Sequence, residues 1–307
     1  MGISAALQTI SNCLSKRSTT FALLWIVLFS HSNVMADTAG SAASGNTLTF
    51  GVVPQQSGGT LARLWTPLLE NLSATTGYHL IFKTAPDIPE FERRLAAGMY
   101  DLAYMNPYHY TTFHQQPGYL AFAREKDKKL QGIIVARADS PHRQLGDLAG
   151  QTLAFPSPAA FAASIVTRAN LRNLSIPFEA KYVSSHDSVY RSVARGLYPA
   201  GGGVMRTFNN IEEDIRKQLR ILWISPGFTP HAFAAHPRLD KSMVDTIQAA
   251  MSQLDQHAEG KALLENLNIK GITPASDEEW NDVRAMNLQI LDDLISISPR
   301  QQATGHP

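Results

Sequence analysis

Cysteine is almost absent from this chain: among its 307 residues the only one is Cys13. It lies ahead of an apolar run near the amino terminus, where it cannot be the lipid-bearing cysteine that follows a lipoprotein signal. Once the amino-terminal segment is removed, no cysteine is left. This excludes disulfides, thiolate nucleophiles and cysteine metal sites in the remaining chain, and such a chain is chemically suited to an oxidising compartment.

An excess of one charge is also missing. The 27 lysines and arginines against 26 aspartates and glutamates give a net charge of +1, which indicates neither nucleic acid nor a strongly acidic partner. The sequence has no G-x-S-x-G elbow, phosphate-binding P-loop or dinucleotide fingerprint. Its 10 histidines are scattered, and His109 and His114 miss the i, i+4 spacing of a helical metal site. We therefore expect no metal, no cofactor and no enzymatic activity.

Long apolar runs are missing too. The apolar run at residues 21–29 is far shorter than the ~20 residues that span a bilayer. It follows Lys16 and Arg17, and a small residue ends the segment, which is the layout of a secretory signal peptide. We predict that residues 1–36 are cleaved on secretion and that residues 37–46 form a flexible tether. An uncleaved membrane anchor is the alternative.

The rest of the chain alternates between short apolar runs and amphipathic segments. This alternation predicts an α/β protein in which helices flank sheets with parallel strands. The predicted strands are residues 47–53, 78–83, 102–105, 119–123, 132–137, 152–155, 178–183, 200–205, 219–225 and 233–235. The predicted helices are residues 61–77, 89–97, 160–174, 187–196, 209–218, 240–256, 261–267 and 277–295.

The order of these elements predicts two lobes. We assign residues 47–137 and 232–296 to lobe 1, residues 138–231 to lobe 2 and residues 297–307 to a disordered tail. Two crossings of the chain would join the lobes and leave a cleft between them. In open parallel sheets ligands bind at the carboxyl ends of strands, so the loops after the strands are expected to face this cleft.

One of these loops leads from the predicted strand 152–155 into the predicted helix 160–174. A helix N-terminus presents unpaired N–H groups and about half a positive charge, so it is suited to an anion. The residues that begin this helix, Ala160, Phe161 and Ala162, carry no hydroxyl or amide. Their backbone N–H groups are therefore the expected ligand contacts.

Polar aromatic residues gather where the third strand ends. Tyr104, Asn106 and Tyr108 offer hydroxyls, an amide and aromatic walls, which suit a small polar ligand. The alternative is that some of these side chains pack into the core. We predict them as binding residues.

Three further candidates lie in the second half of the chain. His186 stands at a predicted helix start that Ser184 or Ser185 would cap, and is either a ligand contact or a surface residue. Arg206 follows three glycines, residues 201–203, which imply close backbone approach or positive φ. Its planar guanidinium suits an oxyanion, although an exposed arginine is the alternative. His231 lies on the predicted return crossing, where it touches the ligand or stiffens the hinge.

The mature chain resembles the periplasmic substrate-binding proteins of ABC importers, specifically the phosphate/phosphite/phosphonate-binding group. The resemblance covers residues 48–294. It rests on the order and spacing of FGVVPQQSGGTLARLWTPLLENLSATTG, GMYDLAYMNPYHY, GIIVAR, LGDLAGQTLAFPSP, SSHDSV and LRILWISP. It implies a two-lobed type II binding protein, with a mixed sheet flanked by helices in each lobe, that closes on its ligand.

The resemblance is poorer at the ligand-binding positions. The serine-threonine-serine group with which the family holds phosphoryl oxygens corresponds to residues 160–162, which lack hydroxyls. The family histidine is kept as His186. Arg206 and His231 stand where binders of aminoalkyl phosphonates have acids. This implies a small anionic ligand held by other means.

Three functions fit the resemblance. The first is a monomeric receptor that delivers a small anion to an ABC permease in the inner membrane. The second is a sensory receptor that acts with a sensor histidine kinase. The third is an enzyme, because pyrimidine-forming thiamine enzymes share the fold, but the secretion signal and the lack of a metal or nucleophile motif disfavour it.

Overall fold

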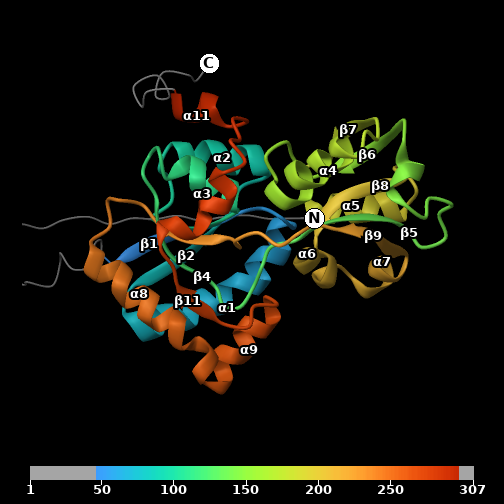
Figure 1. Cartoon of the computed structure of the whole chain (residues 1–307). Coiled ribbons are helices and arrows are strands. Elements are labelled where there is room, and N and C mark those ends of the chain that lie inside the picture. Colours follow the sequence, from blue (N-terminus) through green and yellow to red (C-terminus); the bar gives the residue numbers. More distant parts are fainter. Residues whose placement is uncertain (1–45, 297–307) are drawn as a thin grey trace, which may run out of the picture. The chain divides into compact units, whose positions relative to one another are not determined.

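The computed structural model describes residues 46–296 (Figure 1). The predicted signal peptide, nearly all of the predicted tether and the predicted tail lie outside this range. Within it, no helix has both the length and the apolar character that crossing a membrane requires. The described chain forms two mixed sheets flanked by helices, which confirms the predicted fold class.

The first sheet has six strands in the order β11-β4-β10-β3-β1-β2. Strand β1 is parallel to β2 and β3, whereas β10 runs antiparallel to β3 and β4, and β11 runs antiparallel to β4. The parallel strands end at the same edge, so the loops after β1 and β3 lie close together. The strands are β1 Thr47–Val52, β2 His79–Lys83, β3 Leu102–Met105, β4 Leu120–Glu125, β10 Ala232–Ala235 and β11 Ile272–Pro274.

The second sheet has five strands in the order β7-β6-β8-β5-β9. Strand β6 is parallel to β7 and β8, and β5 is antiparallel to β8 and β9. The strands are β5 Gly132–Arg137, β6 Gln151–Phe155, β7 Phe178–Tyr182, β8 Ala200–Val204 and β9 Leu219–Ile224.

Helices follow most of the strands. Helix α1 packs against β2, α8 and α9, while α5 packs against β8, α6 and α7 (Figure 1). The helices are α1 Gly58–Thr76, α2 Ile88–Ala96, α3 Pro107–Phe113, α4 Thr167–Asn173, α5 His186–Ala194, α6 Met205–Asn210, α7 Glu213–Lys217, α8 Lys241–Gln253, α9 Ala258–Asn266, α10 Asn281–Arg284 and α11 Asp292–Ser296. Short 3₁₀ turns cover Leu145–Leu148, Leu254–Gln256 and Asp277–Trp280, and a π-helical turn covers Phe161–Val166.

Capping side chains begin the helices next to the candidate site. The Asn106 carboxamide oxygen accepts the His109 N–H at 2.8 Å, and Pro107 occupies the first turn of α3, where no N–H is needed. The Ser185 hydroxyl accepts the Ser188 N–H at 3.1 Å and begins α5. Of the two predicted caps for this helix, Ser185 is therefore the one used.

An aromatic cluster forms the core of the first sheet. The Tyr104 ring lies 4.8 Å from the rings of both Trp65 and Phe233, and Phe50 packs beside Trp65. Each aromatic side chain removes a large apolar area from water, so this cluster fixes helix α1 on the sheet. It also fixes the direction of the Tyr104 hydroxyl.

The structure corrects the place where the chain first crosses between the sheets. We predicted lobe 1 to extend to residue 137, but β5 pairs with β8 and β9 in the second sheet, so the chain crosses before Gly132. Strand β9 also belongs to this sheet. A buried strand has the same run of apolar residues in either sheet, because the run depends on burial and not on which strands lie beside it.

Three predicted helices are interrupted. The helix predicted at 277–295 is divided into a 3₁₀ turn, α10 and α11, and Asn287 between them has a φ of 47°, which a continuing helix excludes. The helix predicted at 209–218 is divided at Ile211, whose ψ of 154° is extended. The helix predicted at 160–174 opens with the π-helical turn before α4.

Candidate functional site

Loops from both sheets bring a group of polar side chains together, which we call the Arg206 cluster. Gln55 follows β1, Tyr104 lies on β3, and Glu125 ends β4, all in the first sheet. Arg206 follows β8 of the second sheet, and His231 precedes β10. The cluster consists of Gln55, Tyr104, Glu125, His186, Arg206 and His231.

Arg206 is the centre of this cluster. Its side chain is only 10% exposed and pairs with Glu125, which is 5% exposed. One guanidinium nitrogen also donates to the Tyr104 hydroxyl, and the other donates to the Gln55 carboxamide oxygen at 3.0 Å. The guanidinium carbon lies 5.2 Å from the centre of the Tyr104 ring, within cation–π range. The charge of Arg206 is thus satisfied by the chain itself. Its three partners lie on strands of the first sheet or in the loop after β1.

Both cluster histidines are buried and neutral. Burial, with the Arg206 charge adding to it, lowers the pKa of His186 to about 3, and its Nδ1 lies 2.9 Å from the Thr207 hydroxyl. Burial likewise holds the pKa of His231 well below its usual value. The His231 ring stacks on Tyr104 at 4.9 Å, and its Nε2 lies 3.0 Å from the Gln55 amide nitrogen. Neither ring supplies charge for an anion at neutral pH.

The loop before the π-helical turn closes one side of the site. Asn106 donates from its amide to the Ala159 carbonyl at 3.3 Å, and the His186 N–H donates to the Gln55 carbonyl at 2.9 Å. These bonds join loops of the two sheets directly. They hold the residues after β6 and the start of α5 against the loops after β1 and β3.

The Phe161 side chain fills most of the space next to this loop. Its side chain is 1% exposed and meets Phe228 edge to face at 5.2 Å. The remaining cavity is about 10 Å³, which holds one water molecule at most. It is lined by residues that include Gln55, Asn106, Ala160, Phe161, Ala162, His186 and His231.

The π-helical turn brings its backbone unusually close to the second sheet. The Ala160 carbonyl accepts N–H groups from both Ser164 and Ile165, at 2.7 and 3.2 Å. A Cβ atom at Gly202 would lie 2.0 Å from the Ala163 carbonyl oxygen, and one at Gly132 would lie 2.1 Å from that of Ala162. The glycines after residue 200 therefore serve close approach, one of the two roles predicted for them. π-Helical turns are frequently found at functional sites.

Most predicted site residues come together. Gln55 lines two small cavities. One also has Tyr104 and Arg206 in its walls, and the other has Asn106, Ala160, Phe161, Ala162, His186 and His231.

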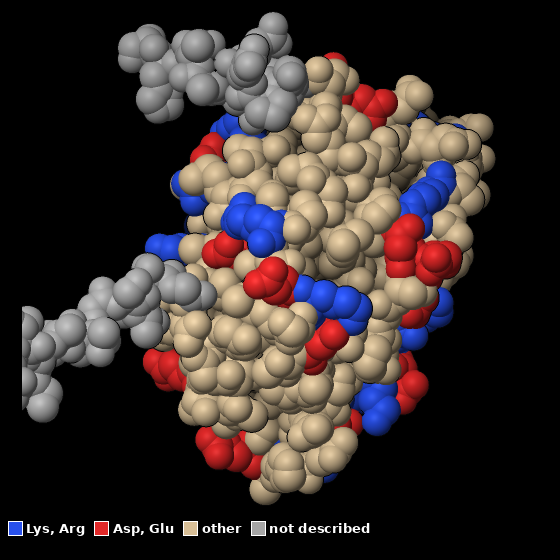
Figure 2. Space-filling model, turned by 90° about the vertical axis from the view of Figure 1, so that its left-hand side faces the viewer, with Lys and Arg blue, Asp and Glu red and all other residues tan. Residues whose placement is uncertain are grey.

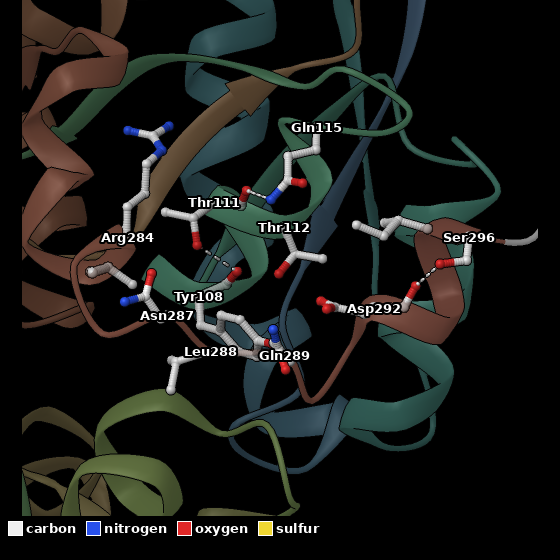
Figure 3. A pocket seen from close by; sticks show the side chains of 12 residues that line it. Tyr108, Thr111, Thr112, Gln115, Arg284, Asn287, Leu288, Gln289, Asp292 and Ser296 are labelled. Atoms are coloured by element: carbon white, nitrogen blue, oxygen red, sulfur yellow. Dashed lines mark hydrogen bonds between the residues drawn. The ribbon is translucent and has the colours of Figure 1, made fainter.

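Tyr108 is the exception. Its hydroxyl accepts the Leu291 N–H at 3.0 Å and lines a separate pocket of about 420 Å³ beside Asn287, Gln289 and Asp292 (Figure 3). Helix α3 starts at Pro107, and Tyr108 points from its first turn toward the segment before α11.

Two cluster residues were not predicted individually. Gln55 lies in a loop that follows a strand and was expected to face the cleft, but an uncharged amide gave no reason to select it. Glu125 is 81 residues from Arg206 in the sequence, and no local pattern relates them. Among residues 46–296, no group of three or more histidine, cysteine or carboxylate side chains is placed to hold a metal ion.

A family model covers most of the described chain. Residues 50–280 match the model described as "ABC transporter, phosphonate, periplasmic substrate-binding protein". The chain is also 23% identical over 269 residues to the phosphate-import protein PhnD of Mycolicibacterium smegmatis, covering 78% of this chain and 84% of that protein.

Two solved structures share the fold. The binding-protein component of an ABC phosphonate transporter from Pseudomonas aeruginosa has a TM-score of 0.71 and 17% identity, covering 78% of this chain and 85% of that chain. PhnD1 from Prochlorococcus marinus in complex with methylphosphonate has a TM-score of 0.72 and 17% identity, covering 82% and 99%. With a family model matched over most of its length, this chain belongs to the family of periplasmic substrate-binding proteins of phosphonate ABC transporters.

Proposed function

We propose that this protein is a periplasmic solute receptor that closes on a small oxyanion, related to phosphate or a phosphonate, and delivers it to an ABC permease in the inner membrane. It changes no covalent bond in its ligand and acts as a monomer. The predicted signal peptide, residues 1–36, would direct export and be cleaved in the process. Family membership and the solved relative with methylphosphonate support this class of ligand.

The observation that carries the proposal is the position of Arg206. It comes from the second sheet, is largely buried and makes its polar contacts with residues of the first sheet. A buried guanidinium is a strong site for an oxyanion, because its charge is poorly screened there. The oxyanion would compete with Glu125 for Arg206. The Asn106 amide and the backbone N–H groups at the start of the π-helical turn would supply neutral donors.

Closure by hinge motion is the mechanism that fits these contacts. Arg206 and the His186 N–H both bind Gln55, so the loop after β1 holds the second sheet at two points. A ligand that replaces some of these bonds between the sheets would stabilise the same closed arrangement. The energy for closure would come from binding and not from a covalent step.

Isothermal titration calorimetry tests this function. Phosphate, phosphite, methylphosphonate, methanesulfonate and acetate would be titrated into the purified protein, with thermal unfolding as a second readout. We expect at least one of them to bind and to raise the melting temperature, and Arg206→Gln to abolish both effects. Arg191→Gln is the matched control, because Arg191 forms a surface ion pair with Glu212. Lack of binding by every anion would overturn the proposal.

A sensory role is the second candidate, and the filled site favours it. Phe161 leaves a cavity of about 10 Å³, and hydrogen bonds of the chain itself join the two sheets. A receptor closed in this way would present a fixed surface to the periplasmic part of a sensor histidine kinase. Genes for a permease and an ATPase beside this gene would support import. A neighbouring kinase gene, and binding of its purified periplasmic part, would support sensing.

A further inference from the structure

A second cavity, of about 470 Å³, lies beside the Arg206 cluster, and we call it the lysine pocket. This volume is within the range of small-molecule sites. Its walls come from the segment after β4, helix α6, helix α9 and the segment after α9. Asn268 on one wall donates to Asn210 at the end of α6, so the two sides of the pocket are tied together.

The lysine pocket is rich in positive charge. Lys126, Lys128, Lys261 and Lys270 line it, and Arg206 reaches it from the cluster. Lys126 pairs with Asp255 at 3.2 Å. In the part of the chain that the structure describes, the other three lysines form no ion pair within 4.0 Å.

The carboxylates of the pocket do not balance this charge. Glu125 is held by Arg206, and Glu265 forms no ion pair with any residue between 46 and 296. On the face that Figure 2 shows, positive and negative side chains lie next to each other. With Lys126 paired to Asp255 and Arg206 paired to Glu125, the other three lysines face one carboxylate around the cavity, which gives it a positive potential.

We propose that the lysine pocket binds a small multivalent anion, one that carries several phosphate or carboxylate groups. An ammonium is a compact point charge on a flexible stem, so separate lysines can each reach a different anionic group. An anion with several charged groups can contact more of these lysines at once than a single small oxyanion can. The pocket shares Arg206 and Glu125 with the Arg206 cluster, but the proposal depends on its lysines and does not rest on the function proposed above.

Calorimetry with two probes tests the site. Sodium tripolyphosphate represents a phosphate chain and citrate represents a tricarboxylate, both at low ionic strength because screening weakens exposed charges. We expect Lys128→Gln, Lys261→Gln and Lys270→Gln each to weaken binding of the preferred probe about threefold, and the triple variant to weaken it about 30-fold. The probe that binds tighter identifies the class of anionic group.

A gain of affinity gives a sharper test. Glu265→Gln removes a repulsive carboxylate and is expected to strengthen probe binding about threefold. Glu259→Gln is its control, because Glu259 is on the same helix but does not line the pocket. Lys241→Gln is the control for the lysines: it is 87% exposed, pairs with Asp245 on α8 and lies outside the pocket. Neither control is expected to change the affinity.

Three outcomes would overturn the proposal. They are no binding of either probe, a triple variant within twofold of the unmodified protein, and a Lys241→Gln variant that loses as much affinity as the pocket variants. Methylphosphonate is titrated into the same triple variant to test the function proposed for the Arg206 cluster separately. Since Arg206 is intact there, a failure of methylphosphonate to bind bears only on the function proposed for the cluster.

Discussion

The Gln55 carboxamide determines where its neighbour carries a proton. Its oxygen accepts from Arg206, so its nitrogen must be the donor to His231 Nε2 at 3.0 Å. Nε2 is therefore unprotonated, and the neutral ring has its proton on Nδ1. A second proton, on Nε2, would break this bond and add a charge close to Arg206. The geometry and the lowered pKa of His231 thus agree.

Acid is expected to destabilise the protein through these histidines. The pKa of both rings is lower in the folded protein than the value near 6.5 of an unfolded chain, so the unfolded state binds more protons below that pH. Stability is full above pH 6.5 and falls as the pH drops toward 3, by up to about 1.4 kcal/mol per pH unit for each histidine. Urea unfolding between pH 7.5 and 4.5 measures this slope.

Two histidine variants test whether the Arg206 cluster causes the fall of stability with decreasing pH. His231→Gln is expected to reduce the slope, whereas His79→Gln changes an exposed residue of β2 and is expected to leave it as it is. Equal slopes in the two variants and the unmodified protein would contradict the assignment.

Phe161 is expected to limit phosphonate binding. Replacing Ala160, Phe161 and Ala162 with Ser, Thr and Ser removes a buried ring and adds three hydroxyls at the predicted ligand contacts. Loss of the ring costs about 3–5 kcal/mol of stability, and each new hydrogen bond contributes about 1 kcal/mol to binding. We expect the affinity for methylphosphonate to rise at least about tenfold, as measured by calorimetry.

Phe91→Ala is the control for an effect of destabilisation alone on ligand affinity. Phe91 is fully buried in the core of the first sheet, so this variant is expected to lower stability without raising the affinity. If the triple variant bound methylphosphonate no better than the unmodified protein, the turn at 161–166 would not be a ligand contact.

Among the elements, the π-helical turn Phe161–Val166 depends most on distant residues. Its carbonyls fit against β5 and β8 only because Gly132 and Gly202 have no Cβ. A side chain there would force the turn away from the sheet and move Phe161 with it. The position of Phe161 is therefore set partly by glycines on two strands of the second sheet.

Gly202→Ala is expected to destabilise the protein by about 1–3 kcal/mol, because the added methyl would overlap a backbone carbonyl. Gly59→Ala is the matched control. Gly59 is in helix α1 with no atom within 4 Å of an added Cβ, so this change is expected to stabilise by roughly 0.5–1 kcal/mol. Urea unfolding compares the two, and a neutral effect of Gly202→Ala would mean that the turn adjusts freely.

The sequence predicts the positions of helices and strands better than it predicts which elements pack or pair with each other. Alternation and turn residues located the strands, and Ser185 was among the predicted caps, because these signals are local. The π-helical turn was not predicted, since it depends on Gly132 and Gly202, which are distant in the sequence. For the same reason the sheet that contains β5 was assigned wrongly.

The candidate site shows the same limit of local sequence signals, which do not predict tertiary contacts. Predicted residues such as Arg206 and His231 do meet in one cluster, because the ends of strands can be located from the sequence. Glu125, which neutralises Arg206, was missed because its role follows only from tertiary packing. Tyr108 was included because it is close to Tyr104 in the sequence, but the first turn of α3 directs it elsewhere.

For the whole molecule, the contacts between the two sheets are the features that a solution experiment can test. Asn210 ends α6, between β8 and β9 of the second sheet, Asn268 precedes β11 of the first, and their side chains are hydrogen-bonded. Because Cys13 is the only cysteine and lies outside the described residues, cysteines can be introduced at both positions without competing thiols once it is replaced.

An Asn210→Cys/Asn268→Cys protein is expected to be cross-linked almost completely by a short bismaleimide, and the linked form to bind methylphosphonate at least about tenfold more slowly. Electrophoresis measures the first effect and stopped-flow mixing the second. Asn210→Cys/Lys241→Cys is the control pair, since α8 does not contribute to the pocket next to Asn268. Equal cross-linking of both pairs would contradict the described contact.

The small cavity next to the Arg206 cluster is expected to limit how fast a ligand binds rather than how tightly it binds. A ligand larger than water enters the cavity beside Asn106 and His186 only after Phe161 has moved out of its place. The observed rate of association should then rise with ligand concentration only to a plateau, whose height is the rate at which the closed site opens. Small anions of different chemistry would share that plateau, because the slow step belongs to the protein.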